Sequence, residues 1–465
     1  FLDYSTLEKR QHYCLEEVRL DQRYAKDLYV GVVPITSVDG RIQIDGAGIP
    51  VEYAVKMHRF SDEALLSRRV EKGLLTTREV HQLAKVLADF HQSAERLDPS
   101  VASQVNTRLQ TNAMEIVESL QEGEDGAIAC SLDALRYWIE SYFTQHWDAF
   151  CGRVNNGFIR ECHGDLHLDN IVSWNEELVP FDGIEFNDEF RWIDVVSDAA
   201  FLAMDLDARG HVQQSRLFIN SYLELTGDHA SLVVLRWYLV YRALIRAMVA
   251  RMKADQHRDD PTIALAAMRD CHDHINLAYR YTIAQRPTLF ITHGLSGSGK
   301  TLVSEIVVVQ RGAIRLRSDI ERKRHFGISP DDPVAPDQKE SLYDASGNHA
   351  TYNRLERLAS GILRDGYSVV IDATFLKSTD RERFHHLAIR ERVAFAILDC
   401  HADLPTLRQR IVDRMAAGED VSDADLSVLD LQVQSEEPLT ETEREHVVDI
   451  PSVVDTIDHI RCTCG

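Results

Sequence analysis

Hydrophobic and polar positions follow two different patterns along the chain. A helical spacing runs from about Leu7 to Ala25, and three short strand-like segments follow between residues 28 and 57. Helical patterns then dominate as far as about Thr282, and short strand-like runs return only between residues 158 and 181. This order predicts an α+β domain with a small antiparallel sheet near its beginning.

The pattern changes after a short, polar, proline-containing stretch at residues 284–288. Beyond it, apolar runs of strand length alternate with helical segments. Such alternation predicts an α/β domain whose parallel sheet is covered by helices. We therefore expect one domain over residues 1–283 and a second over residues 288–465.

Composition is typical of a globular protein and limits the partners. Of the 465 residues, 44% are hydrophobic and 27% are charged, and the formal net charge is −23. This charge argues against a broad nucleic-acid or anionic-membrane surface. The most apolar helical stretch, residues 232–250, carries three arginines, so we expect no membrane span. The sequence does not specify an oligomeric state.

The eight cysteines are scattered without the spacing of a disulfide framework. This distribution predicts reduced thiols in a cytoplasmic protein. The runs Cys271–His274 and Cys462–Cys464 do not have a zinc-ligand pattern, so we expect no zinc site.

A glycine-rich stretch with the pattern G-x-x-x-x-G-K-[ST] lies near the start of the second part. It follows a strand-like run at residues 288–292 and precedes a helical run at residues 302–309. In this pattern backbone amides surround phosphates, the lysine reaches the β- and γ-phosphates, and the hydroxyl binds Mg²⁺. The predicted nucleotide site consists of Gly294, Leu295, Ser296, Gly297, Ser298, Gly299, Lys300 and Thr301.

Two acidic residues and two arginines are candidates to complete this site. Asp319 follows the next strand-like run, at the edge where ligands collect, and can accept a proton from a substrate hydroxyl. Asp372 ends a further apolar run, a position suited to the metal or its water. Arg410 and Arg414 are four residues apart on a predicted helix and can close onto the phosphates. A solvent-exposed basic face is the alternative for these two arginines.

Residues 288–439 resemble the small P-loop kinases, such as gluconate kinase, the kinase domain of polynucleotide kinase and zeta toxin. The resemblance implies that Asp319 faces the substrate. It also implies that a lid carrying Arg410 and Arg414 covers the nucleotide.

A second constellation lies in the first part, where residues 163–170 read His-Gly-Asp-Leu-His-Leu-Asp-Asn. Asp165 and Asn170 have the spacing of a kinase catalytic loop, in which the aspartate accepts the substrate hydroxyl proton and the asparagine binds Mg²⁺. Asp182 follows a strand-like run and supplies a second hard oxygen ligand for the metal. We expect the nearby histidines to order the loop rather than to act as bases.

These residues, together with Phe-Asp-Gly-Ile-Glu-Phe at 181–186, resemble the aminoglycoside phosphotransferase family of eukaryotic-kinase-like enzymes. The resemblance extends over most of residues 1–283 and implies a kinase-like α+β fold. It also implies that Asp198 braces the catalytic loop. Members of this family phosphorylate many hydroxyl compounds, so the family name does not predict the acceptor.

The beginning of the chain departs from a complete kinase-like lobe. The first helix and the strands after it resemble, in their order, the αC helix of a kinase and the strands that lead from it into the hinge. On this reading Glu17 (or Glu16) is the αC glutamate, and Met57 lies near the adenine. The strand lysine would then fall before Phe1. The alternative keeps Lys56 as the phosphate lysine, with a glutamate partner at position 63 or 71.

The two parts in this order resemble bacterial proteins that fuse an aminoglycoside phosphotransferase-like domain to a P-loop kinase. We expect a bifunctional, ATP- and Mg²⁺-dependent enzyme that phosphorylates hydroxyl groups of small molecules. Two alternatives stay open. In the first, only one domain is catalytic and the other is a nucleotide-binding regulatory module. In the second, the protein is a polynucleotide or protein kinase.

Overall fold

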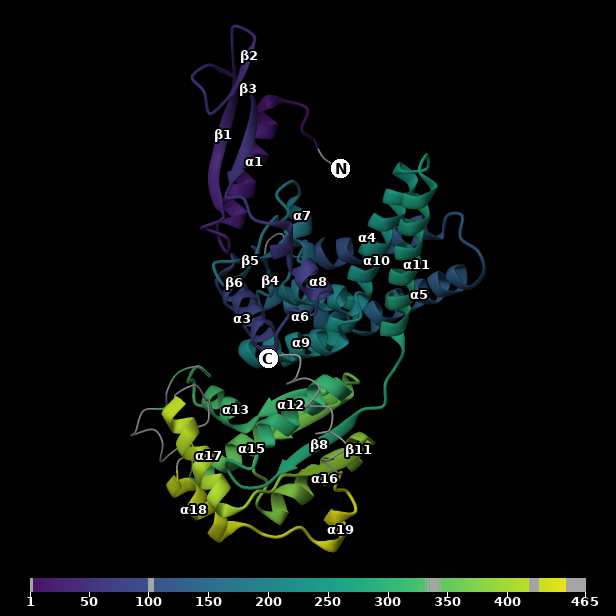
Figure 1. Ribbon diagram of the computed structural model, residues 1–465. Coiled ribbons are helices and arrows are strands. Elements are labelled where there is room, and N and C mark those ends of the chain that lie inside the picture. Colours follow the sequence, from purple (N-terminus) through teal and green to yellow (C-terminus); the bar gives the residue numbers. More distant parts are fainter. Residues whose placement is uncertain are drawn as a thin grey trace. The chain divides into compact units, whose positions relative to one another are not determined.

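The computed structural model describes residues 3–98, 104–330, 344–417 and 426–448, together with Asp332, Val334 and Leu342. The chain forms two compact units (Figure 1). The first unit comprises Phe1–Tyr222 and Val233–Ile283, and the second comprises Leu223–Leu232 and Ala284–Gly465. The short segment Leu223–Leu232 belongs to the second unit although it interrupts the first in sequence, a feature that the hydrophobic pattern did not indicate.

The first unit begins with one helix packed against a three-stranded antiparallel sheet. Helix α1 (Leu7–Asp21) packs on strands β1 (Tyr29–Val38) and β3 (Ile49–Met57), and β2 (Arg41–Ile44) extends the sheet in the order β2-β1-β3 (Figure 1). The Thr6 side chain starts α1 by accepting a hydrogen bond from the amide of Lys9. The helix ends four residues earlier than its spacing predicted, because tight turns follow Asp21.

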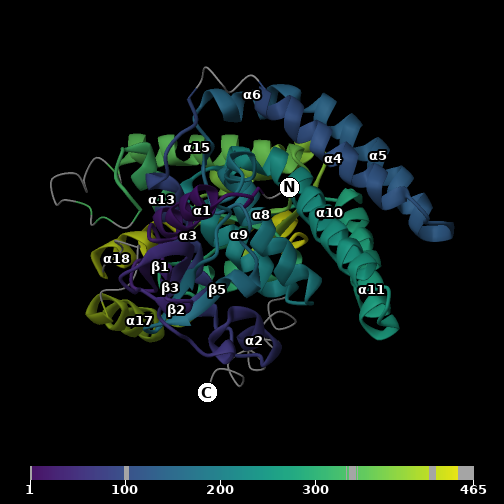
Figure 2. The same cartoon turned by 90° about the horizontal axis from the view of Figure 1, so that it is seen from above.

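The remainder of the first unit is mostly helical. Helix α3 shows why: a capping box joins Thr76 to Glu79, and the residues at helical spacing behind it are buried. Helices α10 and α11 run side by side in both views (Figures 1 and 2). The helices are α2 (Leu66–Glu71), α3 (Thr77–Ser93), α4 (Val105–Gln121), α5 (Gly126–Gln145), α6 (Trp147–Asn155), α7 (Asp188–Arg191), α8 (Val195–Ala208), α9 (Val212–Thr226), α10 (Leu232–Gln256) and α11 (Pro261–Thr282).

Two short antiparallel strand pairs frame the predicted catalytic loop. Strand β4 (Ile159–Glu161) pairs with β7 (Trp192–Asp194), and β5 (Ile171–Trp174) pairs with β6 (Glu177–Pro180). The pattern predicted helix beyond Arg191 and missed β7, because three residues are too few to show a strand periodicity.

The second unit contains a parallel sheet with the order β11-β8-β10-β9, which confirms the predicted helix-covered parallel sheet. Parallel strands bring their carboxyl ends to one edge, where ligands bind in such folds. The strands are β8 (Thr288–His293), β9 (Ile314–Arg317), β10 (Val369–Asp372) and β11 (Ala394–Asp399). The helices are α12 (Lys300–Arg311), α13 (Ser318–His325), α15 (Ala345–Arg364), α16 (Ser378–Glu391), α17 (Leu404–Ala417), α18 (Leu426–Ser435) and α19 (Glu441–Arg444).

Within the described part of the chain, no helix combines the length and the apolar character that crossing a bilayer requires.

Candidate active sites

The glycine-rich stretch of the second unit forms a tight loop between β8 and α12. Gly294, Gly297 and Gly299 have φ angles of 138°, 82° and 96°, which side chains rarely adopt. A Cβ atom on Gly294 would lie 2.2 Å from the carbonyl oxygen of Cys400. The loop can therefore bring its amides and the positive end of α12 to one point, which suits a phosphate group.

Lys300 and Asp372 lie together beside this loop. Lys300 Nζ donates a hydrogen bond to the carbonyl oxygen of Leu295 at 2.7 Å. Burial lowers the pKa of Lys300, while the negative charge of Asp372 opposes that change. Asp372 accepts a hydrogen bond from Ser304 Oγ at 3.1 Å, which places its carboxylate next to the first turn of α12, where Thr301 lies. The Thr301 hydroxyl and the Asp372 carboxylate are hard oxygen donors that could hold Mg²⁺ directly or through water.

Asp319 lies in the first turn of α13, at the carboxyl end of β9. Its carboxylate accepts hydrogen bonds from Arg317 Nη2 at 3.0 Å and from the amide of Ile320 at 3.0 Å. Burial opposes ionisation, but Arg317 holds the pKa of Asp319 below its usual value. An ionised carboxylate of low basicity is better suited to orienting a substrate hydroxyl than to removing its proton early.

The two predicted lid arginines lie on α17, near the loop. Arg410 Nη1 donates to the carbonyl oxygen of Gly297 at 3.1 Å, and the charge of Arg414 contributes to lowering the pKa of Lys300. An apolar cluster joins α17 to α18 and to Leu295 of the loop.

Gln432 on α18 was not predicted to take part in the site. Its side-chain oxygen accepts a hydrogen bond from the amide of Ser296 at 2.8 Å. A single glutamine in a helix carries no sequence signal for such a contact, because the loop lies 136 residues away in sequence.

In the first unit, the structure brings Asp165, Asn170 and Asp182 together. Asn170 Nδ2 donates to Asp165 Oδ2 at 3.2 Å and lies 3.4 Å from the carbonyl oxygen of Asp182. Burial opposes ionisation of Asp165, but His167, with Nε2 at 3.3 Å, holds the pKa of that carboxyl at about 2. Partial desolvation and the charge of Asp165 raise the pKa of Asp182. Asn170 and Asp182 could hold Mg²⁺, whose positive charge would favour the ionised form of Asp182.

The loop that carries Asp165 is held by buried polar groups. Asp198 accepts hydrogen bonds from the amides of His163 at 2.8 Å and Gly164 at 3.0 Å, and Arg242 donates to the carbonyl oxygen of Gly164 at 2.9 Å. Asp21 accepts a hydrogen bond from the amide of Gly183 at 3.0 Å, which ties α1 to the residue after Asp182. Sequence reasoning named Asp198 but missed Asp21 and Arg242, which lie far from the motif in sequence.

Glu17 is half-buried on α1 within a group of carboxylates. Burial, followed by the charges of Glu185, Asp21 and Asp182, raises the pKa of Glu17 to about 8. Met57 packs in the apolar cluster that includes Phe181, the residue before Asp182.

Lys56 lies on β3 with an exposed side chain. Its alternative partners form other ion pairs: Glu63 with Lys72, and Glu71 with Arg68 at 3.0 Å. Neither glutamate forms an ion pair with Lys56 within the described part of the chain.

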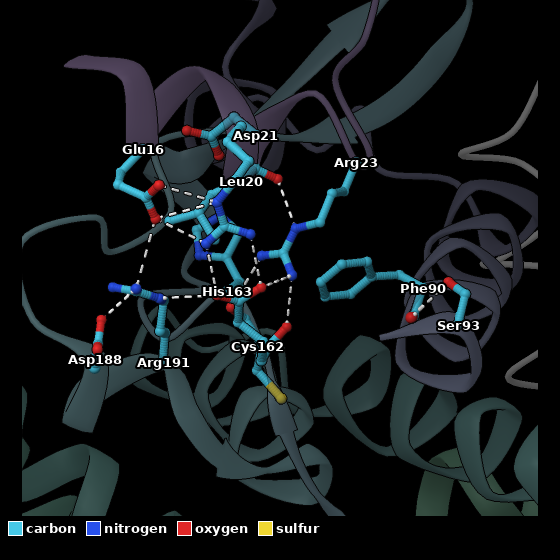
Figure 3. Close-up of polar contacts among 12 residues, drawn as sticks. Glu16, Leu20, Asp21, Arg23, Phe90, Ser93, Cys162, His163, Asp188 and Arg191 are labelled. Carbon is cyan, nitrogen blue, oxygen red and sulfur yellow. Dashed lines mark hydrogen bonds and ion pairs between the residues drawn. The ribbon is translucent and has the colours of Figure 1, made fainter. Parts of the chain in front are cut away.

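A cluster around Glu161 joins α1 to β4, the strand that leads into the loop of residues 163–170. The carboxylate of Glu161 accepts hydrogen bonds from Arg19 at 2.7 Å, Arg23 at 3.0 Å and Arg191 at 3.2 Å. In Figure 3, Arg23 and Arg191 approach this cluster from opposite sides. The cluster fixes α1, and with it Glu17, relative to the loop.

Comparison with known proteins gives one family match and several relatives. Residues 289–439 match the model of the AAA domain family. Uncharacterized proteins of Mycobacterium tuberculosis and Mycobacterium bovis are 28% identical over 428 residues, which cover 91% of this chain and 82% of each relative.

Solved structures with partial similarity include a gluconokinase from Sinorhizobium meliloti (21% identity, 37% of this chain and 90% of that chain, TM-score 0.25). A Plasmodium vivax ethanolamine kinase is 13% identical over 50% of this chain and 68% of its own, with a TM-score of 0.33. The family match and the loop geometry support a P-loop kinase domain in the second unit.

Proposed function

We propose that the protein is a cytoplasmic phosphotransferase with two ATP·Mg²⁺ centres, each of which transfers the γ-phosphoryl group to a hydroxyl of a small molecule. In the second unit the proposal rests on the loop of Gly294–Thr301 with Lys300, Asp372 and Asp319 around it. In the first unit it rests on one observation, the bridging of Asp165 and Asp182 by Asn170.

In each centre the acceptor hydroxyl attacks the γ-phosphorus while the bond to the β–γ bridging oxygen breaks, and ADP leaves with the electron pair. Asp165 and Asp319 orient the attacking hydroxyl and receive its proton as the new bond forms. Mg²⁺, when bound, neutralises charge on the phosphates. Lys300, Arg410 and Arg414 add positive charge in the second centre.

Two single variants separate the centres. Asp165→Asn and Lys300→Ala are each incubated with ATP and a small-molecule extract, and the phosphorylated products are compared with those of the wild type by mass spectrometry. Each variant is expected to lose a different product by at least about 100-fold, the scale of a lost catalytic group. The matched controls are Asp133→Asn on α5 and Lys253→Ala on α10, which should retain both products.

The outcomes also decide between the proposal and its alternatives. If one variant keeps every product, the unit that carries it is not an enzyme under these conditions, and a nucleotide-responsive regulatory role replaces the proposal for that unit. If labelled phosphate appears only on added RNA, DNA or protein, the small-molecule acceptor is wrong.

A further inference from the structure

The first unit contains a cavity of about 1010 Å³ that reaches Gly164 and Asp165. Helices α4 and α10 and the segment after Asp182 supply its walls. The volume lies at the upper end of the range found for small-molecule sites. A molecule in this cavity can place one atom beside the Asp165 carboxylate, so the cavity is continuous with the proposed catalytic centre.

The walls are largely apolar and aromatic. The segment after Asp182 supplies Ile184, Phe186, Phe190 and Trp192, and α10 supplies Tyr241, Ile245, Met248 and Val249. Apolar surface of this kind favours binding of a ligand with an aromatic or aliphatic body, because water is released from both surfaces on binding.

Apart from Asp165 and the exposed Glu115 on α4, the acidic side chains on the walls are paired with arginines. Asp194 pairs with Arg153, Asp188 with Arg191, and Glu189 with Arg108 at 2.5 Å. A ligand with several positive charges needs carboxylates that are available to it, and here these three are already neutralised. A sugar would leave many hydroxyls against apolar walls, at a cost in lost hydrogen bonds to water.

We infer that the acceptor of the first centre is an uncharged, largely apolar alcohol of drug size, whose single exposed hydroxyl meets Asp165 while its body fills the cavity. This inference rests on the proposed phosphotransfer at Asp165. The hydroxyl oxygen bonds to the γ-phosphorus of ATP, the β–γ bridge breaks with its electrons going to ADP, and the proton passes to Asp165 and then to water.

The first test measures binding without catalysis. Nile red, an uncharged apolar dye, is titrated into the full chain and its fluorescence is followed. Ile245→Asp and Val249→Asp place a charge on the apolar wall and should weaken dye binding at least tenfold. The control is Met252→Asp, because Met252 lies on the same helix and is 47% exposed, against 45% for Val249, but does not line the cavity. If all three variants bind the dye like the wild type, the apolar site is not in this cavity and the inference is wrong.

The second test measures transfer in a Lys300→Ala background, so that only the first centre turns over. Uncharged aromatic and alicyclic alcohols are compared with the polycation kanamycin and with gluconate, and ADP release is measured. We expect turnover with the alcohols alone, and we expect the same alcohols to displace Nile red. In Val249→Asp, the KM for these alcohols should rise while the KM for ATP stays unchanged.

The outcomes distinguish the inference from the proposed function. Turnover of kanamycin or gluconate without turnover of apolar alcohols overturns the inference and leaves phosphotransfer standing. A different result would be that Nile red binding depends on Val249 and is retained in Asp165→Asn, while no acceptor of any class is phosphorylated. That result overturns the phosphotransfer on which the inference rests.

Discussion

Asp198 Oδ2 accepts a hydrogen bond at 2.8 Å from the backbone amide of His163, 35 residues earlier in the chain. The same carboxylate accepts the amide of Gly164 with its other oxygen, and His91 Nε2 lies 3.4 Å away. Both oxygens of this buried carboxylate therefore accept hydrogen bonds from the loop that precedes Asp165.

We expect Asp198→Asn to destabilise the first unit by about 2–4 kcal/mol. The asparagine side chain has one acceptor oxygen, whereas the backbone amides of His163 and Gly164 each need one, so a buried N–H is left without a partner. Urea unfolding measures the change. Asp133→Asn, an exposed position that accepts one hydrogen bond from Gln121, is the control and should change stability by less than about 0.5 kcal/mol. Equal effects of the two variants would show that Asp198 does not brace the loop.

Glu161 offers a second prediction about the same loop. Burial opposes its ionisation, but Arg19 and Arg23 hold the pKa of Glu161 below its usual value. Glu161→Gln should cost about 1–3 kcal/mol, because it weakens buried hydrogen bonds to a charged acceptor, while Glu16 and Asp188 still pair with Arg19 and Arg191. Glu118→Gln, which breaks an exposed pair with Arg136, should cost less than about 1 kcal/mol. Thermal unfolding of the two variants side by side measures the difference.

Gly294 is predicted to tolerate no side chain. With a φ of 138° and the carbonyl oxygen of Cys400 2.2 Å from the position of an added Cβ, Gly294→Ala should weaken ATP binding at least about tenfold. Gly361→Ala is the matched control, since Gly361 lies in α15 with open space around its Cα. That change should leave affinity unaltered and stabilise the protein by about 0.5–1 kcal/mol. Calorimetric titration with ATP would contradict the prediction if both variants bound equally well.

Gln432 is expected to order the phosphate loop through its hydrogen bond to Ser296. Gln432→Ala should weaken ATP binding about fivefold, the effect of losing one hydrogen bond of about 1 kcal/mol. Gln409→Ala on α17 removes a glutamine that donates a hydrogen bond to Asp413, and it serves as the control. An unchanged Kd in Gln432→Ala would show that the loop is ordered without α18.

His229 gives the second unit a predictable response to acid. Burial lowers the pKa of His229 from 6.5 to about 4, so the folded protein keeps this ring neutral. Its contribution to stability is complete above about pH 6.5 and is lost as the pH falls toward 4, at a cost on the order of 3 kcal/mol.

His229→Gln should therefore show a smaller loss of unfolding free energy between pH 7 and pH 4 than the wild type does. His386→Gln, at a position with an exposed ring, should follow the wild-type curve. Parallel pH dependence in all three proteins would mean that His229 is not held neutral.

Local motifs could be predicted from the sequence, and their supporting contacts could not. The spacing of Asp165 and Asn170, and the glycines of 294–299, are set within a few residues, so their chemistry can be inferred without the fold. Asp21, Arg242 and Gln432 act on these loops from helices far away in sequence. A lone acidic, basic or amide residue in a helix has no periodicity that distinguishes it from its neighbours.

The placement of residues 223–232 in the second unit has a practical consequence for dissecting the protein. The polypeptide crosses between the units at three places, so one cut at position 284 cannot release a complete second unit. A fragment starting there would lack Glu224, which lies 2.9 Å from the buried guanidinium of Arg315. Such a fragment would lose the nearer of two carboxylates that pair with Arg315 and would keep only Glu305, at 3.6 Å. A circular permutant or a co-expressed peptide would be needed to restore the lost ion pair.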